Sequence, residues 1–227
     1  MTQQAKLISA IVAATVLIFG GLTYLLVRAP GDSTIINPTA IFHDENAISI
    51  GKADSAVVVH TYSDFQCPAC KAAEPALKAV VEAYKDRVKF IWKNFPLITI
   101  HQNARNAANA AQCANVEGKF WDYHDRLYAS QEGWAGLSDP KERFVQLAKD
   151  SGLNIQDFTS CYDARRYDDL VMKDEKEGVE NGVDSTPTFY INNAEAQVRT
   201  EAQWRAALDA ALQRAQNSVT ATSTSTK

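Results

Sequence analysis

Two cysteines three positions apart, Cys67 and Cys70, are the residues of this sequence best suited to chemistry. They stand in the segment Cys67-Pro68-Ala69-Cys70, which directly follows a β-branched run of strand length and opens a helical pattern. The free N–H groups and the macrodipole at a helix N-terminus favour a negative charge, and they therefore stabilise a thiolate, the reactive form of cysteine. We expect Cys67 to be the nucleophile of a thiol–disulfide exchange and Cys70 to be the resolving thiol.

Three other uses of two cysteines at this spacing compete with this interpretation. Covalent haem attachment requires a histidine directly after the second cysteine, where this chain has Lys71. A structural zinc site usually takes two close pairs of ligands, whereas Cys113 and Cys161 lie far apart and neither belongs to a second pair. An inert disulfide between Cys67 and Cys70 is the third alternative. The position between a strand and a helix favours redox chemistry over all three.

The elements around this motif alternate between strand and helix. A strand-like run at 57–62 precedes a helical pattern at 67–84, and a second strand-like run follows at 88–92. A third strand-like run, 188–191, comes after Pro187. An amphipathic helix closes the pattern. Because a strand–helix–strand order implies a parallel pair with a crossover helix, we expect an α/β fold.

Between about residues 101 and 181 the pattern is helical only, which predicts an all-helical insertion into this fold. One helix start is well marked, with Asp139 as the expected N-cap and Pro140 as the expected first helical residue. The four histidines show no metal-ligand spacing, and we expect packing or surface roles for them; they are His43, His60, His101 and His124. The sequence predicts no metal site.

Residues 7–27 form an uncharged run of 21 residues. As a helix this run would span about 31 Å, close to the roughly 30 Å hydrocarbon core of a bilayer. The apolar part of a cleaved signal is shorter, about 7–15 residues, and no convincing cleavage site follows. A buried core helix is the other alternative, but it fits poorly with the Pro30-Gly31 that follows. Lys6 only slightly favours a cytoplasmic N-terminus, which would place the rest of the chain outside the cytoplasm.

The chain therefore divides into four predicted parts. Residues 1–28 hold a cytoplasmic stub and a transmembrane anchor, 29–43 a polar tether, 44–215 the globular domain and 216–227 a Ser/Thr-rich tail predicted to be disordered. A domain of this size buries about 70% of the surface that its unfolded chain exposes, so it can form a stable core without disulfides or metal ions. The net charge of −4 and the absence of a basic cluster argue against a nucleic-acid partner.

Four segments, in order, resemble the DsbA-like thiol–disulfide oxidoreductases of the thioredoxin superfamily. They are Ser-Asp-Phe-Gln-Cys-Pro-Ala-Cys at 63–70, Asn-Phe-Pro-Leu at 94–97, Gly-Lys-Phe-Trp at 118–121 with His124, and Thr-Pro-Thr-Phe at 186–189. Pro75 matches the kink proline of the superfamily. The resemblance extends from about residue 48 to about 212. It implies a thioredoxin fold with a helical insertion, and it implies no cofactor.

The resemblance also implies roles for residues outside the motif. The family carries a cis-proline beside its two cysteines, so the bond before Pro187 is expected to be cis, with the Thr186 backbone presented to an extended substrate segment. From the residues alone, Pro187 could equally be a turn proline that opens a strand. Some members have a second, non-catalytic disulfide, which implies a structural bridge between Cys113 and Cys161; two buried free thiols and a redox sensor are the alternatives.

The function expected from these features is disulfide exchange with cysteine-containing extracytoplasmic proteins, on the periplasmic or cell-surface side, through a mixed disulfide on Cys67. A dithiol oxidase is the preferred direction; a disulfide reductase or isomerase, or a non-enzymatic chaperone-like binding module, is the alternative. The partner expected to restore the active form is a membrane protein, either a quinone-linked oxidase or a reductant. Because Ala69 offers the thiolate no positive charge, we expect a potential between about −270 and −120 mV.

Overall fold

The structure is a computed structural model that describes residues 35–36, 40–45 and 47–224. The predicted transmembrane anchor at residues 7–27 and most of the predicted tether lie outside these residues. Within the described part of the chain, no helix is long and apolar enough to cross a membrane. All of the described elements belong to one unit, Thr34–Lys227.

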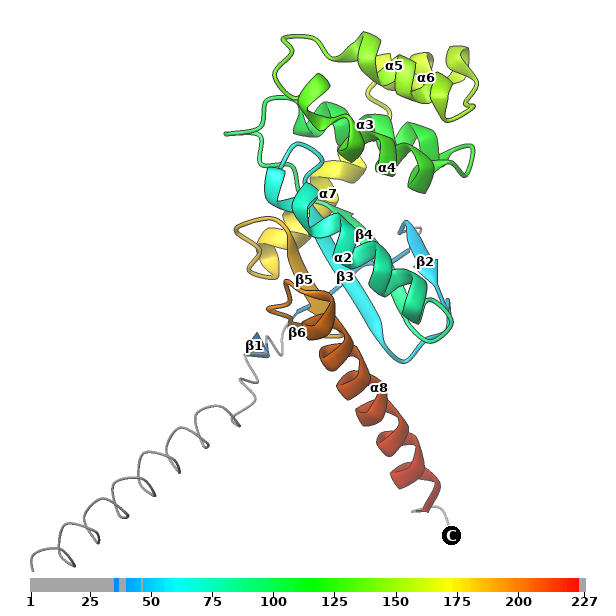
Figure 1. Ribbon diagram of the computed structural model, residues 1–227, viewed down its shortest axis with the longest axis vertical. Coiled ribbons are helices and arrows are strands. Elements are labelled where there is room, and N and C mark those ends of the chain that lie inside the picture. The colour runs from blue at the N-terminus through cyan, green and yellow to red at the C-terminus, as the bar shows by residue number, and fades with distance from the viewer. Residues whose placement is uncertain (1–34, 37–39, 46, 225–227) are drawn as a thin grey trace, which may run out of the picture. The chain divides into compact units, whose positions relative to one another are not determined.

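The sheet of this unit is mixed, with its described strands in the order β1-β6-β5-β3-β4-β2 (Figure 1). Strand β3 (Val58–Ser63) pairs in parallel with β4 (Lys89–Asn94) and antiparallel with β5 (Thr188–Ile191). The other strands are short: β1 (Ile35–Ile36), β2 (Ser49–Gly51) and β6 (Ala194–Glu195). Helix α2 (Pro68–Tyr84) is the crossover that joins the parallel pair.

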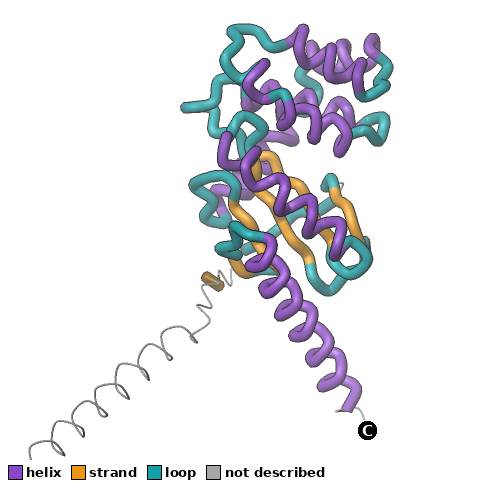
Figure 2. The backbone as a smooth tube through the Cα atoms, in the orientation of Figure 1, coloured by secondary structure: helices purple, strands orange, loops and turns teal. Residues whose placement is uncertain are grey.

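The two faces of the sheet are covered by different helices. Helices α2 and α8 (Glu201–Thr224) lie together on one face (Figures 1 and 2), where Val59, Trp204 and Leu208 belong to one buried apolar cluster. Side chains alternate along a strand, so Tyr62 points to the opposite face. There it packs against α7 (Asp168–Glu180), close to Gly178. A Cβ atom at Gly178 would lie 2.7 Å from the Phe95 ring, which explains why the helix has glycine at this position.

The segment between β4 and α7 forms a separate helical layer at one end of the sheet (Figure 1). Its helices are α3 (Ala104–Asn115), α4 (Phe120–Ala129), α5 (Lys141–Asp150) and α6 (Ile155–Asp163), with the 3-10 turn η1 (Gln131–Gly133) between α4 and α5. Its core is aromatic and alanine-rich, and Trp134 and Phe144 are fully buried in it. The prediction of an α/β fold with an all-helical insertion is confirmed.

Two predicted helix starts need correction. Helix α2 begins at Pro68, with Cys67 as its N-cap. Helix α5 begins at Lys141, one residue later than predicted, because the Asp139 carboxylate accepts the Lys141 N–H at 2.9 Å and Pro140 becomes the N-cap.

The predicted disordered tail at 216–227 is helical as far as Thr224, so the domain boundary predicted at 215 falls inside α8. The hydroxyls of Ser218 and Thr220 donate to the carbonyls of Arg214 and Gln216, one turn earlier. These bonds to carbonyls four residues earlier fit a helical backbone in a stretch that composition alone assigns to a disordered segment.

Candidate active site

Cys67 occupies the boundary between the β3–α2 loop and helix α2. As the N-cap it has an extended backbone (φ −71°, ψ 122°), and Pro68 supplies the first helical residue. Its side chain makes no capping hydrogen bond; its Sγ atom lies 3.5 Å from the carbonyl oxygen of Thr186, to which Cys67 can donate only in its protonated form. The sulfur therefore faces the loop that precedes β5, which lies 119 positions away in the sequence.

The two thiols of the motif have opposite acidities. The pKa of Cys67 is lowered to about 5, first because the Cys70 thiol donates a hydrogen bond to its sulfur, and partial burial only partly opposes this shift. The Thr186 side chain and the backbone N–H groups of Ala69 and Cys70 lower it further. The pKa of Cys70 is raised, chiefly by burial and then by Cys67. Neither thiol is in a disulfide, so near neutral pH the site holds a thiolate at Cys67 and a neutral thiol at Cys70.

The loop opposite Cys67 carries the other two predicted site residues. The Thr186–Pro187 peptide bond is cis, and both residues line a hollow of about 460 Å³ beside the first turns of α2. Ala69, Ala72 and Ala73 form the helix side of this hollow. The hollow adjoins Thr186, whose carbonyl oxygen lies 3.5 Å from Sγ of Cys67. The structure thus brings Cys67, Cys70, Thr186 and Pro187 together.

Asp64, three residues before Cys67, holds the β3–α2 loop in place through hydrogen bonds. Its buried carboxylate accepts hydrogen bonds from the N–H of Gln66 at 2.7 Å, the N–H of Leu97 at 2.9 Å and Nδ1 of His101 at 2.7 Å. These bonds connect the β3–α2 loop to the segment that follows β4. His101 therefore has a positioning contact in addition to the packing role expected from the sequence.

The helical insertion supports the motif directly. The Gln131 side chain, from η1, donates to the backbone carbonyls of Phe65 at 2.7 Å and Cys67 at 3.1 Å. Gln66 donates to the carbonyl of Ala135 and accepts the Asn103 N–H at 2.7 Å. Sequence reasoning missed Gln131 and Asn103, because each bonds a partner far away in the sequence and neither stands in a local motif.

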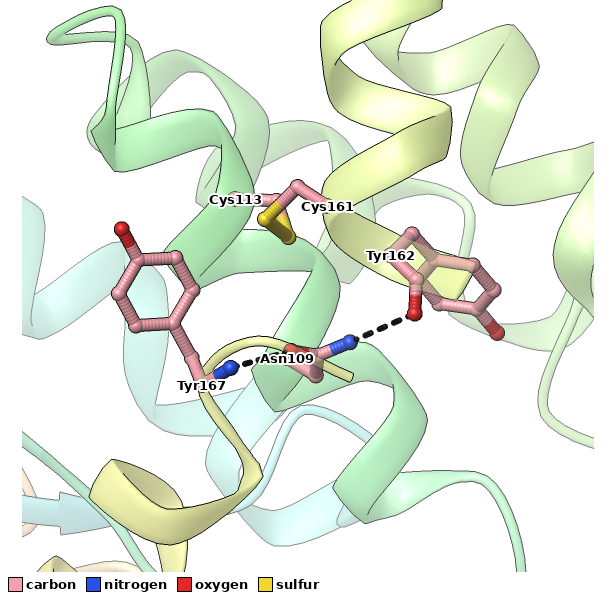
Figure 3. Close-up of a disulfide and its surroundings, with 5 residues drawn as sticks. All are labelled: Asn109, Cys113, Cys161, Tyr162 and Tyr167. Carbon is pink, nitrogen blue, oxygen red and sulfur yellow. Dashed lines mark hydrogen bonds between the residues drawn. A yellow bond between two sulfur atoms is a disulfide. The ribbon is translucent and has the colours of Figure 1, made fainter. Parts of the chain in front are cut away.

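The second pair of cysteines lies inside the insertion. Cys113 of α3 and Cys161 of α6 form a disulfide, with 5.9 Å between their Cα atoms (Figure 3). Beside it, the Asn109 side chain donates to the carbonyl of Tyr162 at 3.2 Å and accepts the N–H of Tyr167 at 3.1 Å. The disulfide and this asparagine together connect α3 to α6 and to the segment that leads into α7.

The remaining histidines and acids do not form a metal centre. Among the described residues, no group of three or more His, Cys, Asp or Glu side chains is placed to hold a metal ion. His60 is buried, stacks on Phe42 with 3.8 Å between ring centroids, and lies 3.1 Å from the Asp44 carboxylate. His124 is buried among aromatic rings of the insertion and β4.

A strand–Cys-x-x-Cys–helix unit facing a cis-proline loop, on a sheet of this topology, defines a thioredoxin-type site. The model of a protein family described as "Thioredoxin" matches residues 43–210. The chain belongs to this family.

Two named relatives match parts of this chain. The chain is 24% identical over 184 residues to a Bacillus anthracis protein named probable disulfide bond formation protein D, a match that covers 79% of this chain and 83% of that protein. A Na⁺/H⁺ antiporter NhaA of Salinispora tropica is 32% identical over 142 residues, 63% of this chain. The match covers only 21% of the antiporter, so the chain spans about a fifth of the length of the antiporters that it matches.

Solved structures show the same fold at low sequence identity. BdbD from Bacillus subtilis has a TM-score of 0.67 and 22% identity, covering 75% of this chain and 95% of that one. The α-DsbA1 of Wolbachia pipientis has a TM-score of 0.68 and 18% identity, covering 77% and 94%. These likenesses establish the thioredoxin-like fold with its helical insertion.

Proposed function

We propose that this chain is a protein thiol–disulfide oxidoreductase that exchanges disulfides through a mixed disulfide on Cys67. The observation that carries the proposal is the pair of opposite acidities at one helix start: a Cys67 thiol with a pKa of about 5 beside a buried Cys70 thiol whose pKa is raised. A thiolate at the start of the helix supplies both a nucleophile and a good leaving group. The relatives named for disulfide bond formation support the same chemistry.

In the oxidising direction, the disulfide is transferred to the substrate in two exchange steps. A substrate thiolate attacks Sγ of Cys67 in the Cys67–Cys70 disulfide, and Cys70 leaves as a thiolate that takes up a proton. A second substrate thiolate then attacks the substrate sulfur of the mixed disulfide, and Cys67 leaves as a stable thiolate. Two electrons pass from the substrate dithiol to the protein, and the substrate gains one disulfide.

The low pKa of Cys67 favours this direction. Stabilising the thiolate stabilises the reduced form of the protein, which makes its disulfide a stronger oxidant. It also speeds the second step, because a thiol of low pKa is the better leaving group. A reductase or isomerase would use the same residues in reverse, and it remains the second candidate because Cys67 is equally suited to attack a substrate disulfide.

Substrate binding is assigned to Thr186, Pro187 and the hollow beside α2. A backbone that runs extended past the Cys67 sulfur can pair with a substrate strand of any sequence. The substrates that fit this mode are cysteine-containing polypeptides that are still unfolded. A chaperone-like module would use the same hollow without the thiols, and it would bind such polypeptides equally well after Cys67→Ser.

We assign the domain to the extracytoplasmic side of a membrane, tethered by the predicted segment at residues 7–27. The Cys113–Cys161 disulfide supports this location, because structural disulfides persist in oxidising compartments. The proposed redox partner is a membrane protein that reoxidises Cys67 and Cys70, such as a quinone-linked oxidase.

The test is the equilibrium potential of the Cys67–Cys70 couple, measured in glutathione buffers with alkylation traps, together with the oxidation of a reduced, unfolded secreted protein. We expect a potential less negative than about −220 mV and catalysis that Cys67→Ser abolishes. A potential near that of thioredoxin, about −270 mV, would assign the chain to the reductases. Catalysis that survives Cys67→Ser would overturn the proposed function.

A further inference from the structure

Helix α2 has a second hollow on the flank that faces away from Pro187. Seen along a helix with 3.6 residues per turn, Ala69, Ala72 and Ala73 share one side, whereas Glu74, Leu77 and Val81 share another, whose mean direction is roughly 120° away. The first set lines the hollow beside the cis-proline loop, and the second lines a separate hollow between α2, β4 and α4.

This second hollow has the size of one aromatic ring and apolar walls. Its volume is about 160 Å³, and its walls come mainly from Ile50, Leu77, Val81, Phe90, Trp92 and Trp121. An apolar cavity of about 150 Å³ accepts benzene, so a hollow of this volume has room for one such ring. The shape and lining therefore suit a single six-membered ring.

Two neighbouring polar side chains, His124 and Glu74, are among the residues that line the hollow. His124 is 3% exposed, and its Nε2 atom has no hydrogen-bond partner in the described structure. The nearest acidic atom is Oε1 of Glu74 at 3.7 Å, too far for a hydrogen bond. Nδ1 of His124 lies 3.2 Å from the Asp125 carboxylate, which can only accept, so in the neutral ring Nε2 is an acceptor. The hollow thus offers two neighbouring acceptors, Nε2 of His124 and the Glu74 carboxylate.

The charged residues at the rim are already paired with each other. Lys78 forms a close ion pair with Asp125, and Glu82 accepts from Nζ of Lys85 at 2.7 Å. Apart from Glu74, whose pKa is raised by burial, the charged side chains that line the hollow therefore offer no free charge to a ligand. The complement of this site is a neutral ring with one hydrogen-bond donor.

We propose that the hollow between α2 and α4 binds a neutral phenol, with its ring against Leu77, Val81 and Trp121 and its hydroxyl donating to Nε2 of His124 or to Glu74. The phenol can come from a free small molecule or from a tyrosine side chain, since both present the same group. The site is separate from the thiols and from the hollow beside Pro187.

Binding to the full chain can be measured by isothermal titration calorimetry and by ligand-observed NMR, with three probes. We expect p-cresol to bind saturably, with a Kd of roughly 1 mM or tighter. Toluene, which has the same ring and no donor, should bind about five- to tenfold more weakly because it leaves both acceptors unpaired. N-acetyltyrosinamide separates the sources: binding equal to that of p-cresol indicates a tyrosine, and binding much weaker than p-cresol indicates a free phenol.

Three variants locate the site. Leu77→Trp should fill the hollow and remove p-cresol binding, whereas Ala72→Trp, on the other flank of α2, should leave it unchanged. His124→Phe removes one of the two acceptors and should narrow the difference between p-cresol and toluene; if this buried change unfolds the chain, Glu74→Met serves instead, because it removes the other acceptor. Equal affinity of the parent for p-cresol and toluene, no saturable binding at all, or p-cresol binding that survives Leu77→Trp would overturn the proposal.

Discussion

The two cysteine pairs of this chain are almost equally buried, yet they stand at opposite ends of their helices. Cys67 lies at the N-terminus of α2, whereas Cys113 and Cys161 each lie in the last turn of their helix, α3 and α6. Exposure does not separate them, at 6% for Cys67 against 3% and 2% for the other two. The helix macrodipole favours a thiolate at the first position and disfavours one at the other two.

The surroundings add to this difference. The Cys67 sulfur meets a thiol donor, backbone N–H groups and the cis-proline loop, whereas the sulfurs of Cys113 and Cys161 are bonded to each other between α3 and α6. Reactivity in this molecule is therefore set by the helix end at which a cysteine lies and by what faces its sulfur. Burial alone does not decide it.

The largest expected effect separates Cys67 from Cys70. In the reduced chain, Cys67 measured in Cys70→Ser should react with iodoacetamide at pH 7 at least about a hundredfold faster than Cys70 measured in Cys67→Ser. A lowered pKa means that the Cys67 rate rises with pH through about 5 and is flat from about pH 6 upward. The serine at position 70 keeps a hydroxyl donor toward Cys67.

Stopped-flow alkylation across pH 3 to 10 gives both profiles, with free cysteine as the reference thiol of pKa about 8.5. A faster Cys70, or a Cys67 midpoint near 8.5, would reverse the contrast between the two pairs.

The second effect is on stability. Replacing Cys113 and Cys161 together by Ala opens a loop with a sequence separation of 48, which in the chain-entropy model lowers the free energy of unfolding by about 3–4 kcal/mol. Urea unfolding measures this loss, and the initial rate of disulfide exchange should be unchanged in the folded variant. A folded double variant without exchange activity would show that the second pair takes part in the chemistry.

The sequence predicted the parts of the site that are local. The β-branched run before Cys67, the helix after it and the strand after Pro187 are each specified by neighbouring residues, and the structure has all three. Strands β2 and β6 were not predicted, because strands of three and two residues form only by pairing with adjacent strands of the sheet. Gln131 was missed for the same reason, since its two acceptors lie 66 and 64 positions away.

The third prediction concerns Gln131, which connects the helical insertion that holds the Cys113–Cys161 disulfide to the loop that holds Cys67. Gln131→Met keeps the volume but removes the donor to the Phe65 and Cys67 carbonyls, while Cys67 keeps the Lys71 N–H. Leaving a buried carbonyl without its donor costs about 1–3 kcal/mol of unfolding free energy. Urea unfolding of this variant is compared with Gln146→Met, an exposed glutamine of α5 that should change stability little. Equal stabilities for the two variants would show that the insertion does not support the motif through this residue.

The smallest effect is expected at the surface ion pair nearest to the thiols. Nζ of Lys71 lies 2.6 Å from Oε1 of Glu132, and the Glu132 side chain is 76% exposed. Exposed pairs are screened by water and salt, and they contribute little to stability. Glu132→Gln frees the Lys71 ammonium, yet neither residue is among the groups that lower the Cys67 pKa. The urea midpoint and the alkylation midpoint near pH 5 should therefore match the parent at both low and high salt. Lys71→Gln is the matched control, which removes the cation instead of its partner.

If Glu132→Gln lowers the Cys67 midpoint further and Lys71→Gln raises it, a surface charge tunes the thiolate. The helix end and the groups that face the Cys67 sulfur would then not fully explain the difference between the two cysteine pairs.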